Sequence, residues 1–156
     1  MKKKPWSRAP ALAEQGRETM SIEENKAIAR RFIRVWDTDD PSILDELAAP
    51  DIRVSYPILP PIQGAGAFKE VLAGVRAALP DIKIEIGNVI AEGDFVVAPW
   101  TISGTHLGDL MGIPPSGRRV TWDGITIYRI EDGKVVDERG EENGLGLLRQ
   151  IGAIPG

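Results

Sequence analysis

Apolar and polar residues alternate most clearly in the last third of the chain, in residues 117–143, GRRVTWDGITIYRIEDGKVVDERGEEN. Aromatic and β-branched side chains alternate with other residues in its first half, at Val120, Trp122, Thr126 and Tyr128, which is typical of a half-buried strand. Asp132-Gly133 then predicts a two-residue hairpin turn, because both residues tolerate a positive φ. Residues 134–143 are expected to return as the partner strand. That strand is largely charged, so it forms either a solvent-facing edge or the wall of a polar pocket.

The first half of the chain has a helical period instead. Apolar residues recur at helical intervals up to Trp36, and Ser21 and Glu24 have the spacing of a capping box, so a helix is expected from Ser21 to about Trp36. A second, short helix is expected to have Asp40 as its cap and Pro41 at its first position. A third is expected over about residues 67–79, with Pro80 ending it.

Short strands with turn signals fill most of the remaining sequence. They are expected at residues 51–56, 82–91 and 94–106, ahead of the long hairpin, with a terminal helix over 144–152. Helices followed by a strand meander predict an α+β fold in which a curved antiparallel sheet wraps around the N-terminal helices. Such a sheet forms a cone with an open mouth. The loop at 107–117 is either a lid over that mouth or a fixed crossover.

Length, composition and charge narrow the class of protein. A chain of 156 residues with 42% hydrophobic and 27% charged residues is expected to form one globular domain. No apolar run approaches the length of a membrane span, and the absence of cysteine favours the cytoplasm. Residues 1–20 carry a net charge of +3 and the remainder −7, so we expect no nucleic-acid partner. Residues 1–19 lack any period and are expected to be a disordered extension of a domain spanning 20–156.

Three segments of the strand region carry a family resemblance. They are GTHLG at 104–108, GIPPSGRRV at 112–120 and GITIYR at 124–129. Together with residues 25–32 they resemble the SnoaL-like polyketide cyclases, which have a nuclear-transport-factor-2-like fold. The resemblance covers about Ser21 to Pro155. It implies the cone fold, a deep apolar pocket, often a homodimer, and ring closure by intramolecular aldol chemistry without metal or cofactor.

The acid/base of that family marks a departure in this chain. By motif alignment the family's aspartate falls at Thr126, and a threonine cannot serve as a carboxylate base. Ketosteroid isomerases share the fold, but their base, oxyanion tyrosine and protonated acid would fall at Tyr56, Phe32 and Thr126, none of which matches. Relatives of limonene-epoxide hydrolase need an arginine that the strand at 94–106 lacks.

The candidate catalytic residues are His106, Glu138 and Tyr56. His106 is the only histidine and ends a strand beside the glycine-rich loop, where it could shuttle protons or simply bond a loop carbonyl. Glu138 could replace the missing aspartate, with its pKa raised by apolar walls, or lie on a solvated edge strand. Glu142 has the same parity, and there the solvated edge is the favoured interpretation. Tyr56 could donate a hydrogen bond to an oxyanion or fill the core.

Aromatic residues of the predicted sheet and first helix are candidates for binding a flat hydrophobic ligand. They could equally well plug the cone themselves. With the polar residue at the family's aspartate position, the expected ligand-binding set is Trp100, Trp122, Thr126, Tyr128, Phe32 and Trp36.

These observations lead to two hypotheses. The first is a cofactor-independent SnoaL-like enzyme that uses proton transfer for aldol cyclisation, isomerisation, dehydration or hydrolysis of a small hydrophobic, polyketide-like carbonyl compound. The second is a non-catalytic small-molecule-binding or dimerisation domain of the same fold. No set of metal ligands is apparent, so neither hypothesis includes a metal.

Overall fold

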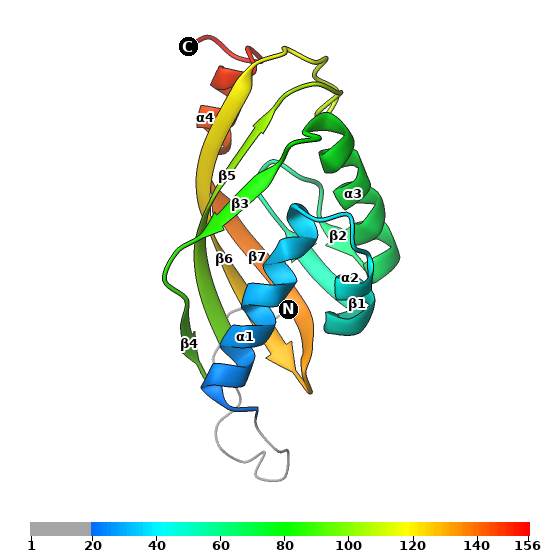
Figure 1. The fold of residues 1–156 in the computed structure, drawn as a ribbon, viewed down its shortest axis with the longest axis vertical. Coiled ribbons are helices and arrows are strands. Elements are labelled where there is room, and N and C mark those ends of the chain that lie inside the picture. The colour runs from blue at the N-terminus through cyan, green and yellow to red at the C-terminus, as the bar shows by residue number, and fades with distance from the viewer. Residues whose placement is uncertain (1–19) are drawn as a thin grey trace, which may run out of the picture.

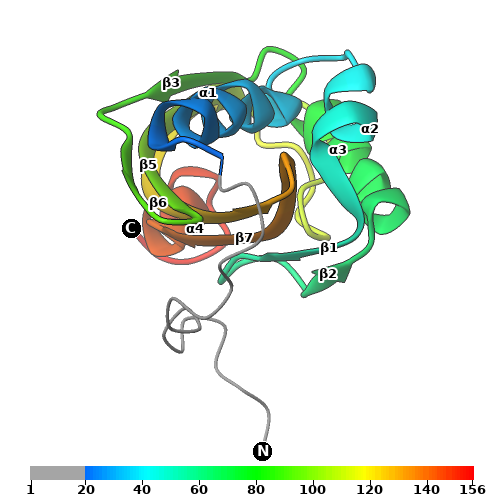
Figure 2. The same cartoon turned by 90° about the horizontal axis from the view of Figure 1, so that it is seen from below.

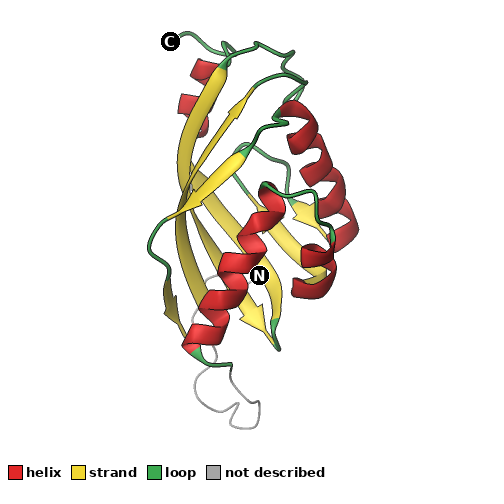
Figure 3. Ribbon diagram, in the orientation of Figure 1, coloured by secondary structure: helices red, strands yellow, loops and turns green. Residues whose placement is uncertain are grey.

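A computed structural model of the protein describes residues 20–156, so the expected disordered extension at 1–19 lies outside the described residues. Figures 1 and 3 show a curved sheet with the helices of residues 22–78 on one side of it and the C-terminal helix next to the strands at the end nearest the C-terminus. The helical elements are α1 (Ile22–Phe32), the 3-10 helix η1 (Ile33–Trp36), α2 (Ser42–Leu47), α3 (Ala65–Ala78) and α4 (Gly144–Gln150). The strands are β1 (Ala48–Ser55), β2 (Ile62–Gln63), β3 (Lys83–Ile86), β4 (Ile90–Glu92), β5 (Phe95–Thr105), β6 (Arg119–Glu131) and β7 (Lys134–Glu142).

The predicted capping box starts the first helix. The Ser21 hydroxyl accepts from the Glu24 N–H at 3.1 Å, and the Glu24 carboxylate accepts from the Ser21 N–H at 2.7 Å. Both bonds satisfy backbone donors that a helix start leaves free. After Phe32 the helix tightens into η1, which keeps Val35 and Trp36 buried. The predicted end at Trp36 is therefore confirmed.

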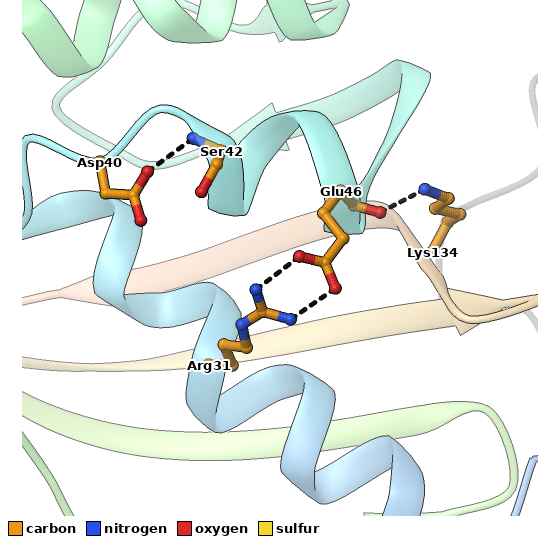
Figure 4. A network of polar contacts seen from close by, with 5 residues as sticks. All are labelled: Arg31, Asp40, Ser42, Glu46 and Lys134. Atoms are coloured by element: carbon orange, nitrogen blue, oxygen red, sulfur yellow. Dashed lines mark hydrogen bonds and ion pairs between the residues drawn. The ribbon is translucent and has the colours of Figure 1, made fainter.

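A polar network ties α1 to α2 and to the start of β7 (Figure 4). Arg31 donates two parallel hydrogen bonds to the Glu46 carboxylate, and Lys134 donates to the Glu46 carbonyl. The Asp40 carboxylate accepts from the Ser42 N–H at 3.0 Å. The predicted cap is therefore wrong by one residue: Pro41 rather than Asp40 is the N-cap and the helix begins at Ser42, although the Asp40 side chain still bonds the first backbone N–H of the helix.

The seven strands form one sheet in the order β2-β1-β7-β6-β5-β3, with β4 also paired to β5. Seen from below, this sheet curls around the interior, and α1, α2 and α3 lie on its concave side (Figure 2). The predicted α+β class is confirmed. The sheet is mixed, however, rather than purely antiparallel, because β1 pairs in parallel with β7.

The strand expected at 82–91 is interrupted. β3 pairs with residues 100–103 of β5 and β4 with residues 95–97, so the two flank Pro99. Pro99 has no N–H that could donate to a neighbouring strand. Its carbonyl oxygen accepts a hydrogen bond from the Gly87 N–H at 2.8 Å. The break therefore follows from the proline. None of the helices between residues 20 and 156 is long and apolar enough to cross a membrane.

Candidate active site

A pocket lies on the concave side of the sheet, between the strands, η1 and α3. Its cavity volume, the space open to the centre of a water-sized sphere, is about 50 Å³; about 550 Å³ lies between its side chains when the opening to solvent is counted. Its wall is apolar and aromatic apart from one carboxyl group, that of Glu142, and the polar tips of tyrosine and tryptophan. The lining residues are Ile33, Trp36, Tyr56, Ile58, Leu59, Val75, Leu79, Ile82, Ile84, Trp100, Ile102, Leu110, Met111, Trp122, Glu142 and Leu147.

Two glycines on the inner face of the sheet make room for the aromatic wall. Gly124 lies opposite Trp100 on the neighbouring strand, and a Cβ at Gly124 would overlap the Trp100 ring. A Cβ at Gly140 would likewise overlap the ring of Tyr56. Each glycine thus lets an aromatic ring approach the strand closely, which fixes where that ring meets the pocket.

A chain of hydrogen bonds runs behind this wall and ends on one carboxylate oxygen. The indole N–H of Trp100 can only donate, and it donates to Oγ1 of Thr126 at 2.8 Å. Oγ1 lies 2.9 Å from the Tyr56 hydroxyl, which donates to Oε1 of Glu138 at 2.6 Å. The indole N–H of Trp36 donates to the same oxygen at 3.0 Å. Since the Tyr56 proton is directed to Glu138, the Thr126 hydroxyl donates to Tyr56.

A β-bulge turns Glu138 towards this network. Next to the hairpin turn, Ile130 of β6 pairs with Val135 of β7. Two residues further from the turn on β6, Tyr128 pairs with Glu138, which is three residues further on β7, so β7 contains one extra residue, Val136. A bulge of this kind shifts the alternation of side chains by one position. It places Glu138, which has no solvent exposure, on the same face as Val135 and Tyr128.

Asp137 consequently faces the other way. Its carboxylate lies on the outer face of the sheet and accepts from the Arg53 guanidinium at 2.7 Å. The adjacent carboxyl groups of β7 therefore have separate environments, one paired at the outer surface and one enclosed among aromatic rings.

Glu138 has the electrostatics of an acid/base near neutrality. Burial raises its pKa from 4.5 to about 7, although the hydrogen bonds from Tyr56 and Trp36 favour the charged form. Its second oxygen, Oε2, is buried without a hydrogen-bond partner. The pKa values of Tyr56 and Tyr128 are raised well above their usual range, chiefly by burial, so both phenols stay protonated.

Glu142 also belongs to the site, contrary to the solvated edge expected for it. Its Oε2 accepts from the Trp122 indole N–H at 3.0 Å, and its Oε1 is buried without a partner. Burial raises the pKa of this carboxyl group as well. The signal that could have found it is its strand parity with Glu138, which places both inside the curved sheet.

His106 is fully buried and is not among the residues that line the pocket. Its Nδ1 accepts from the backbone N–H of Ser116 at 3.1 Å and lies 3.0 Å from the Ser116 hydroxyl. Because a backbone N–H always donates, this network assigns the proton of the neutral ring to Nε2. Nε2 has no partner. The ring closes the 107–117 loop, whose tip is a tight turn in which Leu110 and Ile113 exchange backbone hydrogen bonds.

The structure brings together most of the residues predicted for the site. Trp36, Tyr56, Trp100 and Trp122 line the pocket. Thr126 and Glu138 lie behind that wall in the hydrogen-bonded chain. Phe32 and Tyr128 pack against each other edge to face, with ring centroids 6.0 Å apart, and lie outside the lining. Among residues 20–156 no group of three or more His, Cys, Asp or Glu side chains could hold a metal ion.

Comparison with known sequences identifies the protein family to which this fold and pocket belong. Residues 26–151 match the SnoaL-like polyketide cyclase family, and the chain belongs to that family. It is 33% identical to the aklanonic acid methyl ester cyclase DauD of Streptomyces sp. (strain C5) over 131 residues, 80% of each protein. It is 34% identical to the nogalonic acid methyl ester cyclase of Streptomyces nogalater over 90 residues, 57% of this chain and 67% of that protein.

Solved structures support the same assignment. A SnoaL-like protein from Jannaschia sp. CCS1 superposes with a TM-score of 0.79 at 26% identity, covering 90% of this chain and all of that one. AclR from Streptomyces galilaeus, a proposed hydroxylase, gives a TM-score of 0.74 at 31% identity, covering 87% and 85%. The nuclear-transport-factor-2-like fold expected from the sequence is confirmed.

Proposed function

We propose that the protein is a cofactor-independent cyclase in which Tyr56 and Glu138 together remove a proton from a carbon next to a carbonyl group. The observation that carries this proposal is the 2.6 Å hydrogen bond from Tyr56, at the pocket wall, to a buried carboxyl group with a pKa of about 7. A base with a pKa near the working pH combines a large fraction in the active form with useful basicity.

The proton travels through Tyr56, because Tyr56 lines the pocket and Glu138 lies behind it. The Tyr56 oxygen takes the proton from the substrate carbon while its own proton passes to Glu138. The two transfers are concerted, since the raised pKa of Tyr56 disfavours a free phenolate. The enolate carbon then attacks a second carbonyl carbon of the same molecule and forms the ring bond. The new alkoxide recovers a proton through Tyr56, so Glu138 ends as a carboxylate and the product is an isomer of the substrate.

This arrangement accounts for the threonine at the family's aspartate position. Thr126 has no carboxyl group, but its hydroxyl hydrogen-bonds to Tyr56, which in turn bonds to Glu138 on the neighbouring strand. The carboxyl function is thus supplied by β7 instead of β6, and Thr126 positions the phenol that connects it to the pocket.

The proposed substrate is a flat, fused-ring polyketide ester. Two curated relatives are named for ring closure of nogalonic and aklanonic acid methyl esters, and the tryptophans of the pocket offer flat surfaces for such a ring system. The predicted ester-cyclase activity rests on that similarity.

Incubation with an aklanonic-type methyl ester, followed by chromatography and mass spectrometry, tests the proposal. Ring closure leaves the substrate mass unchanged, whereas the hydroxylation proposed for AclR would add one oxygen atom. We expect an isomeric product with wild-type protein, and at least a hundredfold slower formation with Glu138→Gln or Tyr56→Phe. Saturable binding of the ester without any conversion would favour the non-catalytic binding domain instead.

We also propose that a second copy of the chain covers the outer face of the sheet. Ile90, Ile125 and Ile127 are 65%, 50% and 41% exposed there. Arg129 and Asp137 lie on this face and are already paired within the chain, with Glu131 and Arg53, so a second copy related by a two-fold axis would cover mainly the isoleucines. Light scattering after size exclusion should give a dimer for the wild type and a monomer for Ile127→Asp; a monomeric wild type would contradict this.

The cytoplasmic location expected from the sequence stays a prediction.

A further inference from the structure

The second carboxyl group of the pocket has no part in the proton path proposed above. Glu142 is the last residue of β7, opposite Gly124 on β6, and its side chain lines the pocket. The Trp122 indole N–H occupies one of its oxygens at 3.0 Å. The other oxygen, Oε1, is buried and accepts no hydrogen bond. A buried polar atom without a partner is costly, so its presence in an apolar pocket calls for a ligand.

We propose that Glu142 determines substrate specificity by accepting a hydrogen bond at Oε1 from a phenolic or enolic hydroxyl group of the substrate. The proposal rests on the pocket assigned above as the cyclase site. Trp122 positions the carboxyl group, because an indole N–H can only donate and therefore holds Oε2 on its own side.

A hydroxyl group fits this position better than a charged group. A carboxylate or phosphate on the ligand would face the Glu142 carboxyl group of the pocket wall, whose free oxygen can only accept a hydrogen bond when it is ionised, and would be repelled. An ammonium group brings three donors into a wall that offers it one free acceptor, so most of its hydration would be lost without replacement. A hydroxyl group needs one acceptor only.

The spacing of the two carboxyl groups suits a fused-ring ligand. Glu138 and Glu142 are four residues apart on one strand, which corresponds to about 13 Å between their Cα atoms. A flat polycycle can therefore present a hydroxyl group to Glu142 while a carbon further along the ring system faces Tyr56. In that orientation Glu142 selects which end of the substrate reaches the proton-transfer pair.

Titration calorimetry with small aromatic probes tests this assignment without turnover. The matched probes are 2-naphthol and 2-methylnaphthalene, which have similar size and differ in the hydrogen-bond donor. Wild-type protein is expected to bind 2-naphthol roughly tenfold more tightly than 2-methylnaphthalene, the effect of one hydrogen bond to a carboxylate. Glu141→Gln is the matched control, since Glu141 carries the same charge on the adjacent residue and its side chain is 71% exposed. It should keep the preference.

Glu142→Gln should replace the hydrogen-bond acceptor at this position with a donor. Its amide oxygen must face Trp122 to accept the indole N–H, so its NH₂ group takes the place of Oε1 and becomes a donor. The variant should therefore lose the preference for 2-naphthol and bind 2-acetonaphthalene, a hydrogen-bond acceptor, more tightly than the wild type does. If this variant fails to fold, Trp122→Phe serves instead: it frees Oε2 and should keep the hydroxyl preference.

The outcomes separate this inference from the proposed function. An unchanged 2-naphthol preference in Glu142→Gln would overturn the role of Glu142 and leave the cyclase proposal intact. A hydroxyl preference that depends on Glu142 in a protein without turnover would overturn the cyclase proposal and leave the binding role of Glu142 standing.

Discussion

The hydroxyl group of Tyr56 lies 2.6 Å from Oε1 of Glu138, although the two residues are 82 positions apart in the chain. The parallel pairing of β1 with β7 creates this contact. Val54 lies beside Glu138 in that pairing, and Tyr56 directly follows the end of β1. The missing side chain of Gly140 leaves space for the Tyr56 ring. A sheet pairing and a glycine thus position the proposed proton-transfer pair.

Replacing the carboxyl group should stop proton transfer while preserving the pocket. Glu138→Gln keeps an oxygen that can accept from Tyr56 and Trp36 but removes the basic site. We expect kcat for ring closure to fall at least a hundredfold with an unchanged melting temperature at pH 5, measured by steady-state kinetics and thermal denaturation. Glu141→Gln, with its exposed side chain, should retain wild-type kcat. Comparable activity in both variants would contradict the assignment.

The raised pKa of Glu138 should make the free energy of unfolding depend on pH. Its pKa is about 7 in the folded state against 4.5 for the free side chain, so the folded state binds more protons between these values. The free energy of unfolding must therefore decrease as the pH rises through this interval. Relative to wild type, Glu138→Gln should gain roughly 2 to 3 kcal/mol between pH 5 and pH 8 in urea unfolding. A pH-independent difference would show that Glu138 titrates normally.

Tyr56→Phe should move the pH profile of catalysis as well as lower the rate. The Tyr56 hydrogen bond favours the charged form of Glu138, and its loss raises the pKa of Glu138 further. The basic form then appears only at higher pH. The rise of kcat/KM with pH should therefore shift upward in any residual activity of this variant. A profile that falls uniformly without shifting would argue that Tyr56 acts apart from Glu138.

Two glycine-to-alanine substitutions should have opposite effects on stability, because one glycine makes room for an aromatic ring and the other lies inside a helix. Gly140→Ala places a methyl group into the Tyr56 ring and should destabilise the protein by about 1–3 kcal/mol and lower activity. Gly74 is inside α3 with nothing within 4 Å of its would-be side chain, so Gly74→Ala should stabilise by about 1 kcal/mol. Urea unfolding measures both. A neutral Gly140→Ala would mean that Tyr56 is free to move aside.

His106 gives a test of the alternative proton carrier expected from the sequence. Asn at this position can replace Nδ1 as acceptor for the Ser116 N–H, whereas Leu cannot. We therefore expect His106→Asn to be more stable than His106→Leu and to retain most of the wild-type kcat. A folded His106→Asn protein without turnover would indicate that His106, and not Glu138, transfers the proton.

Local patterns predicted the elements of this fold well. The capping box of Ser21 and Glu24 and the turn at Asp132-Gly133, where both φ angles are positive, appear as expected. These features depend on residues close in the sequence, so composition and spacing suffice to find them. Alternation along a strand also predicted Trp122 at the pocket wall, whereas Tyr128, which has the same parity, packs against Phe32 outside the lining.

The placement of the carboxyl groups depended on tertiary structure. Counting back from the two-residue turn would set Asp137 opposite Tyr128, and the extra residue Val136 sets Glu138 there instead. The parallel pairing of β1 brings Tyr56 to that carboxyl group across 82 positions, a contact that no local pattern encodes. The sequence by itself determined the strands, the helices and the family. The bulge and the pairing of distant strands decided which residues face the pocket, because both depend on how the whole sheet packs around its core.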